Sequence, residues 1–303
     1  MKKLSTVREL LSQATERNRA VVAFNVNNME LIQAVATAAN DVGVPVILQV
    51  SKGARNYASL PYLRSLVEAA LQTSSVPFAL HLDHGDSFEI CKEVLDAGFT
   101  SVMIDGSHLP FEENIVLTKR VVDYAKKFGA CVEGELGVIG GIEEEKSNEK
   151  SLYTDPATVR EYVERTGVTS LAISIGTAHG AFKYKSEPKL RLDILEKIRK
   201  EIPNTPLVLH GASSVTPFDV ATINNHGGKV MGALGVSEEV LAQTIPLGVR
   251  KINIDSDLRL AFTAKVREYF SNHPDHFDPR GYLGEARKHV SELVKRKLIA
   301  FSK

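Results

Sequence analysis

Short apolar runs rich in β-branched residues recur from one end of the chain to the other, which is the pattern of strands buried on both faces. Stretches with helical periodicity separate them, as at residues 30–43, 87–98 and 111–129. Strand and helix alternate without a long linker, and this predicts a parallel sheet covered by helices. The eight apolar runs lie at residues 20–26, 45–50, 78–83, 100–105, 130–136, 170–176, 206–211 and 249–255.

Turn residues mark the ends of the predicted helices. Gly43, Gly98 and Gly129 each follow a helical stretch and precede a strand, where glycine commonly ends a helix. Ser87 and Ser237 stand where N-caps are expected, because a serine side chain can accept a bond from a free backbone N–H of the first turn. These signals support the element order that the periodicity predicts.

Eight strand–helix units predict an α/β fold of the (β/α)8 TIM-barrel class, built as one domain over residues 1–303. The main alternative, a doubly wound open sheet, normally carries a glycine-containing nucleotide loop after its first strand, and AFNVNN at 23–28 has no glycine. Extra helices are expected at both ends. Residues 1–20 carry an amphipathic helical pattern, and residues 271–303 lie beyond the eighth unit as an arm that we expect at a subunit interface.

Composition narrows the expected partners and location. The 303 residues include 37 basic and 37 acidic side chains, so no net field attracts nucleic acid or an anionic membrane. No apolar run approaches the roughly 18 residues of a membrane span, and the N-terminal segment lacks the apolar core of a signal peptide. The two cysteines, Cys91 and Cys131, have no CxxC neighbour. The expected location is therefore the reducing cytoplasm.

Three histidines stand where a strand-like run gives way to a glycine-containing loop, and they are His84, His179 and His210. Histidine is the commonest metal ligand among side chains, and barrel enzymes assemble their chemistry at the C-terminal ends of strands. One such histidine is more often a half-buried polar residue than a ligand. Three at equivalent places predict a zinc-type site with one position open for substrate.

Inward-facing carboxylates are expected beside these histidines. Glu133 and Glu135 share a face of their strand, because alternate side chains point to the barrel axis. Two crowded carboxylates need nearby cations to stay ionised. Either both pair with Lys or Arg across the barrel, or at least one has a metal-related role. The nearby histidines favour the metal-related role. Asp83 directly precedes His84 and would orient a ligand or act as a general acid/base. His81 is expected to be a core histidine with a local hydrogen bond.

Loops at the same rim carry further signals. HGASS at 210–214 and INIDSD at 252–257 expose backbone N–H and hydroxyl groups, and barrel enzymes often bind phosphate in the loops after the seventh and eighth strands. Asp105 ends its strand at this rim. The polar segment 140–151 is rich in like charge and is expected to be mobile, either as a solvated loop or as a lid that delivers a carboxylate.

In order along the chain stand the motifs HLDHG, VMIDGSH, VEGELG with GGIE, GTAHGAFK, LHGAS and INIDSDLR. This combination closely resembles the class II, metal-dependent aldolases that act on ketose bisphosphates, above all the fructose-1,6-bisphosphate aldolases. The resemblance extends from AFNVNN to FDPRGYLGEAR, which is nearly the whole chain. Two departures are small: Gly134 stands where alanine is usual, and Ser256 replaces threonine but keeps the hydroxyl.

The resemblance implies a metal set. His84, His179 and His210 correspond to the ligands of a catalytic Zn²⁺, which Co²⁺ can replace. Asp105 and Glu135 match positions that hold displaced zinc or a second divalent ion.

The resemblance also implies two proton-transfer groups. Asp83 corresponds to the acid/base that exchanges a proton with the C4 oxygen of the sugar. Glu143 corresponds to the mobile-loop carboxylate that takes a proton from dihydroxyacetone phosphate, with the adjoining Glu144 as the alternative.

Substrate-binding residues follow from the same resemblance. Six residues match the cradle that binds one phosphate and the dihydroxyacetone moiety. A monovalent cation (Na⁺ or K⁺) often binds beside this cradle. The other phosphate would be held by Arg259 and by Arg280 of a neighbouring subunit, with Ser51 close by. The cradle set is Gly180, Gly211, Ser213, Asn253, Asp255 and Ser256.

The implied activity is reversible cleavage of fructose 1,6-bisphosphate to dihydroxyacetone phosphate and glyceraldehyde 3-phosphate, in glycolysis and gluconeogenesis, by a homodimer or homotetramer. Cleavage leaves an ene-diolate, and Zn²⁺ bound by neutral imidazoles can polarise the carbonyl as a Lewis acid. A Schiff-base lysine is not favoured. Lys251 could point inward, but we expect it to pair with Asn253 and Asp255.

Three alternatives remain. An aldolase for tagatose 1,6-bisphosphate differs only in the stereochemistry of one substrate carbon. A metal-dependent hydrolase on the same barrel usually has an HxH pair on its first strand, where this chain has AFNVNN. A non-catalytic sugar-phosphate-binding partner subunit would have a broken metal or acid/base set, whereas Asp83 and all three histidines are present.

Overall fold

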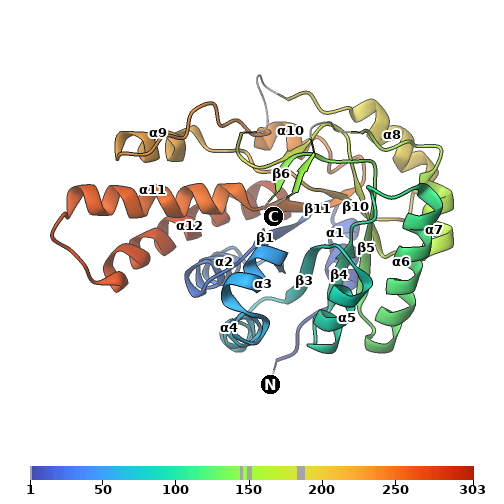
Figure 1. Cartoon of the computed structure of the whole chain (residues 1–303), viewed down its shortest axis with the longest axis horizontal. Coiled ribbons are helices and arrows are strands. Elements are labelled where there is room, and N and C mark those ends of the chain that lie inside the picture. Colours follow the sequence, from blue (N-terminus) through green and yellow to red (C-terminus); the bar gives the residue numbers. More distant parts are fainter. Residues whose placement is uncertain (1, 144–145, 149–151, 183–187) are drawn as a thin grey trace.

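The computed structural model describes residues 2–143, 146–148, 152–182 and 188–303. Eight parallel strands close into a barrel in the order β1-β11-β10-β8-β5-β4-β3-β2, and helices surround it (Figure 1). The prediction of a TIM barrel is therefore confirmed, and each predicted run corresponds to one barrel strand. These strands are β1 (Val21–Asn25), β2 (Val46–Val50), β3 (Phe78–Gly85), β4 (Ser101–Ile104), β5 (Cys131–Leu136), β8 (Ser170–Ile173), β10 (Leu207–Leu209) and β11 (Val249–Ile254).

The helices begin and end where the sequence signals place them. Ser87 and Ser237 are N-caps whose side chains accept a bond from the backbone N–H three residues on. Gly43 and Gly129 are left-handed C-caps, with φ of 77° and 64°. The helices are α1 (Val7–Glu16), α2 (Met29–Val42), α3 (Lys52–Ala58), α4 (Leu60–Thr73), α5 (Phe88–Asp96), α6 (Phe111–Ala125), the 3-10 turn η1 (Lys126–Phe128), α7 (Val159–Thr166), α8 (Leu192–Glu201), α9 (Pro217–Asn225), α10 (Glu238–Ala242), α11 (Ser256–Asn272) and α12 (Pro279–Ser302).

The barrel interior is apolar at one end and polar at the other. Helix α1 closes the N-terminal end, because its buried face packs on inward-facing strand residues. A small apolar layer of Met103, Ala172 and Val208 lies beyond it. Polar side chains occupy the C-terminal end, which is where barrel enzymes place their active sites. The α1 cluster consists of Val7, Leu10, Leu11, Ala14, Val21, Ala23, Ile47, Ala79 and Cys131.

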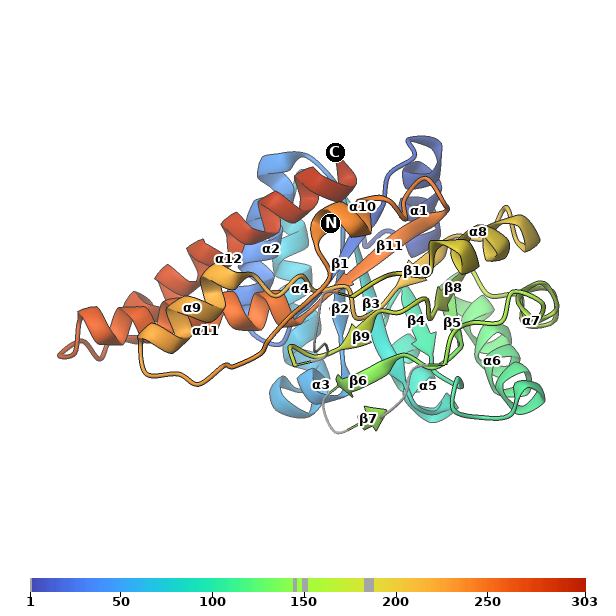
Figure 2. The ribbon, with the colours of Figure 1, turned by 90° about the horizontal axis from the view of Figure 1, so that it is seen from above.

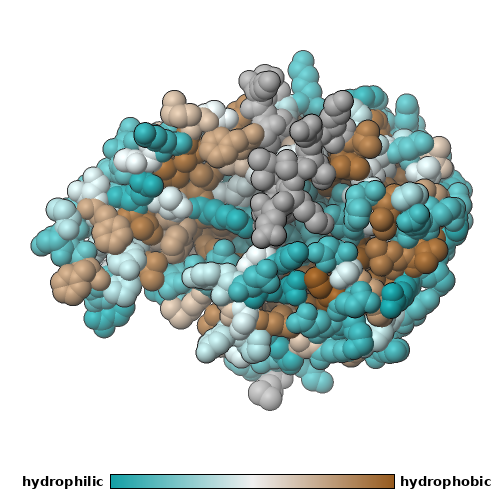
Figure 3. Space-filling view, in the orientation of Figure 1, coloured by the Kyte–Doolittle hydropathy of each residue, from teal (hydrophilic) through white to brown (hydrophobic). Residues whose placement is uncertain are grey.

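Helices α11 and α12 form a hairpin that extends to one side of the barrel (Figures 1 and 2). The predicted arm at 271–303 is only partly an arm. The second half of α12 returns to the barrel, where Leu298 and Phe301 are fully buried and Ala20 N donates to Phe301 O at 2.9 Å. The turn between the helices projects outward, with Phe277 90% exposed. Apolar side chains gather over this end of the molecule in Figure 3.

A small sheet covers part of the C-terminal end of the barrel. Strand β6 (Gly140–Glu143) pairs antiparallel with β7 (Lys146–Asn148) and parallel with β9 (Ala178–His179). The sequence predicted a mobile polar segment here, either a solvated loop or a lid, and no strand. Figure 2 shows this hairpin and α1 at opposite ends of the barrel. Among the described residues, no helix is long and apolar enough to cross a membrane.

Candidate active site

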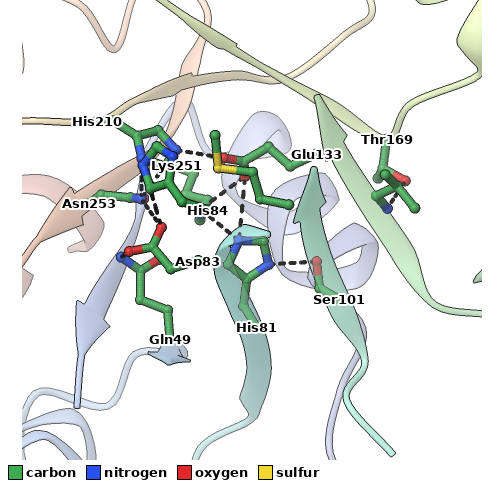
Figure 4. Close-up of polar contacts among 12 residues, drawn as sticks. Gln49, His81, Asp83, His84, Ser101, Glu133, Thr169, His210, Lys251 and Asn253 are labelled. Atoms are coloured by element: carbon green, nitrogen blue, oxygen red, sulfur yellow. Dashed lines mark hydrogen bonds and ion pairs between the residues drawn. The ribbon is translucent and has the colours of Figure 1, made fainter. Parts of the chain in front are cut away.

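The polar end of the barrel is built by inward-facing residues at the carboxyl ends of the strands. In parallel strands these positions all meet at one rim, so side chains far apart in sequence become neighbours. Several histidines, carboxylates and amides converge there (Figure 4). The rim and the layer beneath it contain Asn25, Gln49, His81, Asp83, His84, Asp105, Glu133, Glu135, His179, His210, Lys251 and Asn253.

The three strand-end histidines lie together. One ring nitrogen from each of His84, His179 and His210 lies within 4.8 Å of the other two. The ring of His84 meets those of His210 and His179 edge-on, with centroids 4.5 and 5.0 Å apart. His84 itself has a positive φ of 46° next to a register shift between β3 and β4. Such a bulge re-aims side chains, and strained backbone of this kind clusters at functional sites.

This donor set fits a divalent metal ion. Three imidazoles around one point are a typical zinc arrangement with a position left for substrate. Burial, with the neighbouring His84 and Lys251, holds the pKa of His210 well below its usual range, so this imidazole is neutral, the form that binds metal. A second group brings one ligand atom each from His84, Asp105 and Glu135 within 4.8 Å of one another.

Asp83 is a buried carboxylate held by amides. Asn25 Nδ2 donates to its Oδ2 at 2.7 Å, and Asn253 Nδ2 donates to its Oδ1 at 3.4 Å. Gln49 Nε2 lies 3.4 Å from Oδ2 and donates to Asn25 Oδ1 at 2.5 Å. Burial alone would raise the pKa of the Asp83 carboxyl, but the nearby His84, His210 and Lys251 and the hydrogen bond from Asn25 hold it below its usual range. The site therefore keeps an ionised, oriented carboxylate beside the histidines.

A second buried network lies directly under the histidines. Glu133 Oε1 is 2.7 Å from His210 Nε2, and Lys251 Nζ donates to Glu133 Oε2 at 2.9 Å. His81 Nε2 lies 3.3 Å from Lys251 Nζ, and its Nδ1 is 2.9 Å from Ser101 Oγ. His81 is thus a buried histidine with a local hydrogen bond, as expected.

The expectation that Lys251 pairs with Asn253 and Asp255 is wrong. These side chains are its neighbours in sequence, but the strand and the barrel place the Lys251 ammonium deeper, against Glu133. The two glutamates of β5 have different partners. Glu133 pairs with a lysine across the barrel, whereas Glu135 lies with His84 and Asp105.

The predicted phosphate-binding loops lie next to each other. Ser213 Oγ accepts a hydrogen bond from Asp255 N at 3.2 Å, which joins the loop after β10 to the start of α11. Ser256 is the first residue of α11, so the positive end of that helix points to this region. Gly211 has φ of 61°, and a Cβ there would lie 2.4 Å from Ala178 O, so the close approach requires glycine.

The remaining predicted substrate residues are more peripheral. Gly180 follows His179 with φ of 85°. Ser51 follows β2 and caps α3, accepting a bond from Ala54 N at 3.2 Å. The exposed Arg259 pairs with Asp255 at 2.7 Å.

Arg280 stands apart from the site. It is the second residue of α12, at the outer end of the hairpin, with its side chain 90% exposed and paired with Asp278 at 2.6 Å. That end of the hairpin lies away from the barrel of its own chain (Figures 1 and 2).

Glu143 is the last residue of β6, and its backbone pairs with Lys146 of β7. Gly141 of the same strand pairs with His179, and a Cβ at Gly141 would lie 2.3 Å from His179 O. The hairpin is therefore joined to the backbone of one of the three histidines. Glu144 lies outside the described residues.

Sequence reasoning missed two residues that orient Asp83, namely Asn25 and Gln49. Each occupies an inward position near the end of a strand whose other inward residues are apolar. A polar residue that breaks an apolar alternation at the carboxyl end of a strand was the available signal.

The closed parallel barrel and its rim of three histidines and carboxylates define a barrel enzyme with a candidate metal centre. Residues 5–303 match the family described as fructose-bisphosphate aldolase class-II. A fructose-bisphosphate aldolase from Giardia intestinalis is 48% identical over 301 residues, covering 98% of this chain and 93% of that protein. One from Thermus caldophilus is 47% identical over 300 residues, covering 98% of this chain and 98% of that protein.

Among solved structures, the YdjI aldolase from Escherichia coli K12 matches with a TM-score of 0.82 and 34% identity, covering 99% of this chain and 98% of that one. The chain therefore belongs to the class II fructose-bisphosphate aldolase family. It is an enzyme of the aldehyde-lyase class.

Proposed function

We propose that this chain cleaves fructose 1,6-bisphosphate reversibly, with Zn²⁺ held by His84, His179 and His210. The observation that carries the proposal is the meeting of these three imidazoles with the buried, ionised Asp83 at one rim. The substrate class follows the relatives to which the chain is similar, which are named fructose-bisphosphate aldolases. The products are those that form when the C3–C4 bond of this sugar breaks. Bound zinc, or Co²⁺ in its place, would supply Lewis-acid polarisation of the substrate ketone.

Two protein side chains carry out the two proton transfers of the reaction. Asp83 takes the proton of the C4 hydroxyl as the C3–C4 bond breaks, and glyceraldehyde 3-phosphate leaves with an aldehyde at that carbon. The electron pair of the broken bond stays on the dihydroxyacetone phosphate fragment, which then receives a proton at C3. We assign that proton to Glu143, on the hairpin joined to His179. Asn25, Gln49 and Asn253 keep Asp83 in place.

The two phosphates have separate binding regions in this proposal. Gly180, Gly211, Ser213 and the segment 253–256 bind the phosphate of the dihydroxyacetone moiety, with a monovalent cation beside it. Arg259, Ser51 and Arg280 of a neighbouring subunit bind the other phosphate. A second divalent ion would use His84 with Asp105 and Glu135.

The test is a coupled aldolase assay on the purified protein with and without a chelator. Metal removal should abolish cleavage, and added Zn²⁺ or Co²⁺ should restore it, so activity that survives thorough metal removal contradicts the proposal. Asp83→Ala should lower turnover by orders of magnitude while zinc stays bound. His179→Ala should lose zinc, and full zinc content in that variant would make the ligand assignment wrong.

Tagatose 1,6-bisphosphate is the competing substrate. The same rim contacts would serve both sugars, because they differ at a single carbon. Rates on the two sugars measured side by side decide between them, and we expect the larger kcat/KM on fructose 1,6-bisphosphate.

We also propose that the chain works as a homodimer or homotetramer. Arg280 lies on an arm away from its own barrel, and exposed Phe270 and Phe277 on the same hairpin offer apolar surface to a second copy. This arrangement would bring Arg280 to the active site of the neighbouring subunit.

A further inference from the structure

We infer that Lys297, on the last helix of the chain, is a positioning residue that holds the two loops of the proposed phosphate cradle in place. The inference rests on the proposed function, because it concerns the site at which the phosphate of dihydroxyacetone phosphate binds. Asp257 belongs to the INIDSD segment predicted to bind phosphate, but no role was assigned to its own side chain or to Lys297.

Side-chain hydrogen bonds join the two loops into one unit. Asp255 N donates to Ser213 Oγ at 3.2 Å. The Asp257 carboxylate accepts from Ser214 N at 3.0 Å and from Val215 N at 2.6 Å. The loop after β10 and the start of α11 therefore cannot shift independently while Asp257 keeps both bonds.

The backbone of the first loop needs this support. Val215 has a positive φ of 54°, which is unfavourable for a β-branched residue. Strained conformations persist only where the surroundings over-determine them. Here the two successive N–H groups held by Asp257 supply that constraint just beyond Ser213.

Lys297 supplies the positive charge that keeps the Asp257 carboxylate ionised, so that it can accept both backbone hydrogen bonds. The side chains of Lys297 and Asp257 are 2% and 0% exposed, and their charged groups lie 2.9 Å apart. A buried carboxylate stays ionised only with a cation and hydrogen-bond donors. Lys297 Nζ also donates to Ser214 Oγ at 2.7 Å and lies 2.9 Å from Glu238 Oε1. It thus contacts the loop directly and through Asp257.

A displaced cradle should weaken binding of dihydroxyacetone phosphate more than binding of glyceraldehyde 3-phosphate. In the proposed function both loops that Asp257 joins bind dihydroxyacetone phosphate. Glyceraldehyde 3-phosphate depends on only one residue paired with them, Arg259, and otherwise on Ser51 and on Arg280 of a neighbouring subunit. General loosening of the barrel would instead affect both substrates and the metal site.

The experiment measures aldol condensation by the zinc-loaded protein. Lys297→Met should raise the KM for dihydroxyacetone phosphate by about tenfold or more, since small misplacements of binding groups are costly. The KM for glyceraldehyde 3-phosphate should rise clearly less, and the zinc content should stay at the wild-type value. The matched control is Lys295→Met on the same helix, which removes exposed ion pairs to Asp41 and Glu292 and should change neither KM.

A second variant keeps the test valid if Lys297→Met fails to fold. Asp257→Asn with Lys297→Met removes both buried charges, so folding should survive while the KM for dihydroxyacetone phosphate stays raised. A folded variant with an unchanged KM for dihydroxyacetone phosphate overturns the inference. So does a parallel rise in both KM values with loss of thermal stability.

Failure of the proposed function would look different. If the zinc-loaded wild-type protein condenses no dihydroxyacetone phosphate, that function is wrong whatever Lys297 does. Calorimetric titration with inorganic phosphate then measures the phosphate affinity of the cradle independently of catalysis. Weaker phosphate binding by the double variant than by the wild type supports the role of Lys297, and equal binding contradicts it.

Discussion

At the scale of single residues, the contact between Glu133 and His210 makes a prediction about metal affinity. A carboxylate that binds the second nitrogen of a metal-ligating histidine fixes the ring and raises its basicity. Glu133→Gln keeps the shape but removes the charge 2.7 Å from His210 Nε2. We expect zinc affinity, measured by competition with a chromogenic chelator, to fall about 10–100-fold.

The control for this prediction is Glu68→Gln, which changes an exposed glutamate paired with Arg64 on α4. It should bind zinc like the wild type. Unchanged zinc affinity in Glu133→Gln would mean that the Glu133 contact does not orient a ligand.

Gly134 leads to a second residue-scale prediction. A Cβ there would lie 2.6 Å from the hydroxyl of Tyr162, which is fully buried and bonded to Thr118 and Asn114. Gly134→Ala therefore displaces Tyr162, and we expect about 1–3 kcal/mol of lost unfolding free energy. Urea denaturation measures it.

Tyr162→Phe separates steric crowding from other causes. Removing the hydroxyl makes room for the new methyl, so the cost of Gly134→Ala should shrink in the Tyr162→Phe background. Additive costs in this double-mutant cycle would rule out the clash as the cause.

The residues also show how far sequence can predict this site. The three histidines were predictable because each ends a strand-like run before glycine. The pairing of Lys251 with Glu133 was not, because it depends on how deep each inward position sits in the closed barrel. Asn25 and Gln49 were missed for the same reason, since strand register decides which amide reaches Asp83.

At the scale of elements, α1 is a stability element at the end of the barrel away from the site. Leu11 is buried against the inward residues of several strands. Leu11→Ala should cost about 2–5 kcal/mol of unfolding free energy. The kcat of the folded protein should stay unchanged, because the proposed active site lies at the other end of the barrel.

Ser12→Ala, at an exposed position of the same helix, is the matched control and should leave the unfolding midpoint unchanged. A large loss of kcat in folded Leu11→Ala would show that α1 influences the rim.

Element prediction succeeded where periodicity and caps agree, as for α2, which ends at Gly43, and α5, which begins after Ser87. It failed for the hairpin β6–β7. Its segment is polar, and β6 pairs both with the adjacent β7 and with β9, where Gly141 pairs with His179. The partner β9 is distant in sequence and leaves no local pattern.

At the scale of the whole molecule, the return of α12 to the barrel could not be read from the chain order. The helix looks like an appendage after the eighth unit, yet Phe301 and Leu298 complete the core beside β1. One helix therefore carries Arg280 at its exposed end and Lys297 in the barrel wall. In the proposed function, α12 therefore links the assembly of subunits to the phosphate cradle.

That arrangement permits a test of active sites shared between subunits. Arg280→Ala and Asp83→Ala should each be nearly inactive, since in the proposed function one lacks a phosphate-binding residue and the other lacks the acid/base. When equal amounts of the two variants are mixed and reassemble at random, half of the dimers contain one subunit of each variant. One active site of each such dimer has both residues intact. Activity should therefore recover to about a quarter of the wild-type level. If Arg280 served its own barrel, every site in the mixture would lack one group and no recovery would occur. Size-exclusion chromatography with light scattering verifies that subunits have exchanged, and two samples of the Asp83→Ala variant mixed together provide the inactive control.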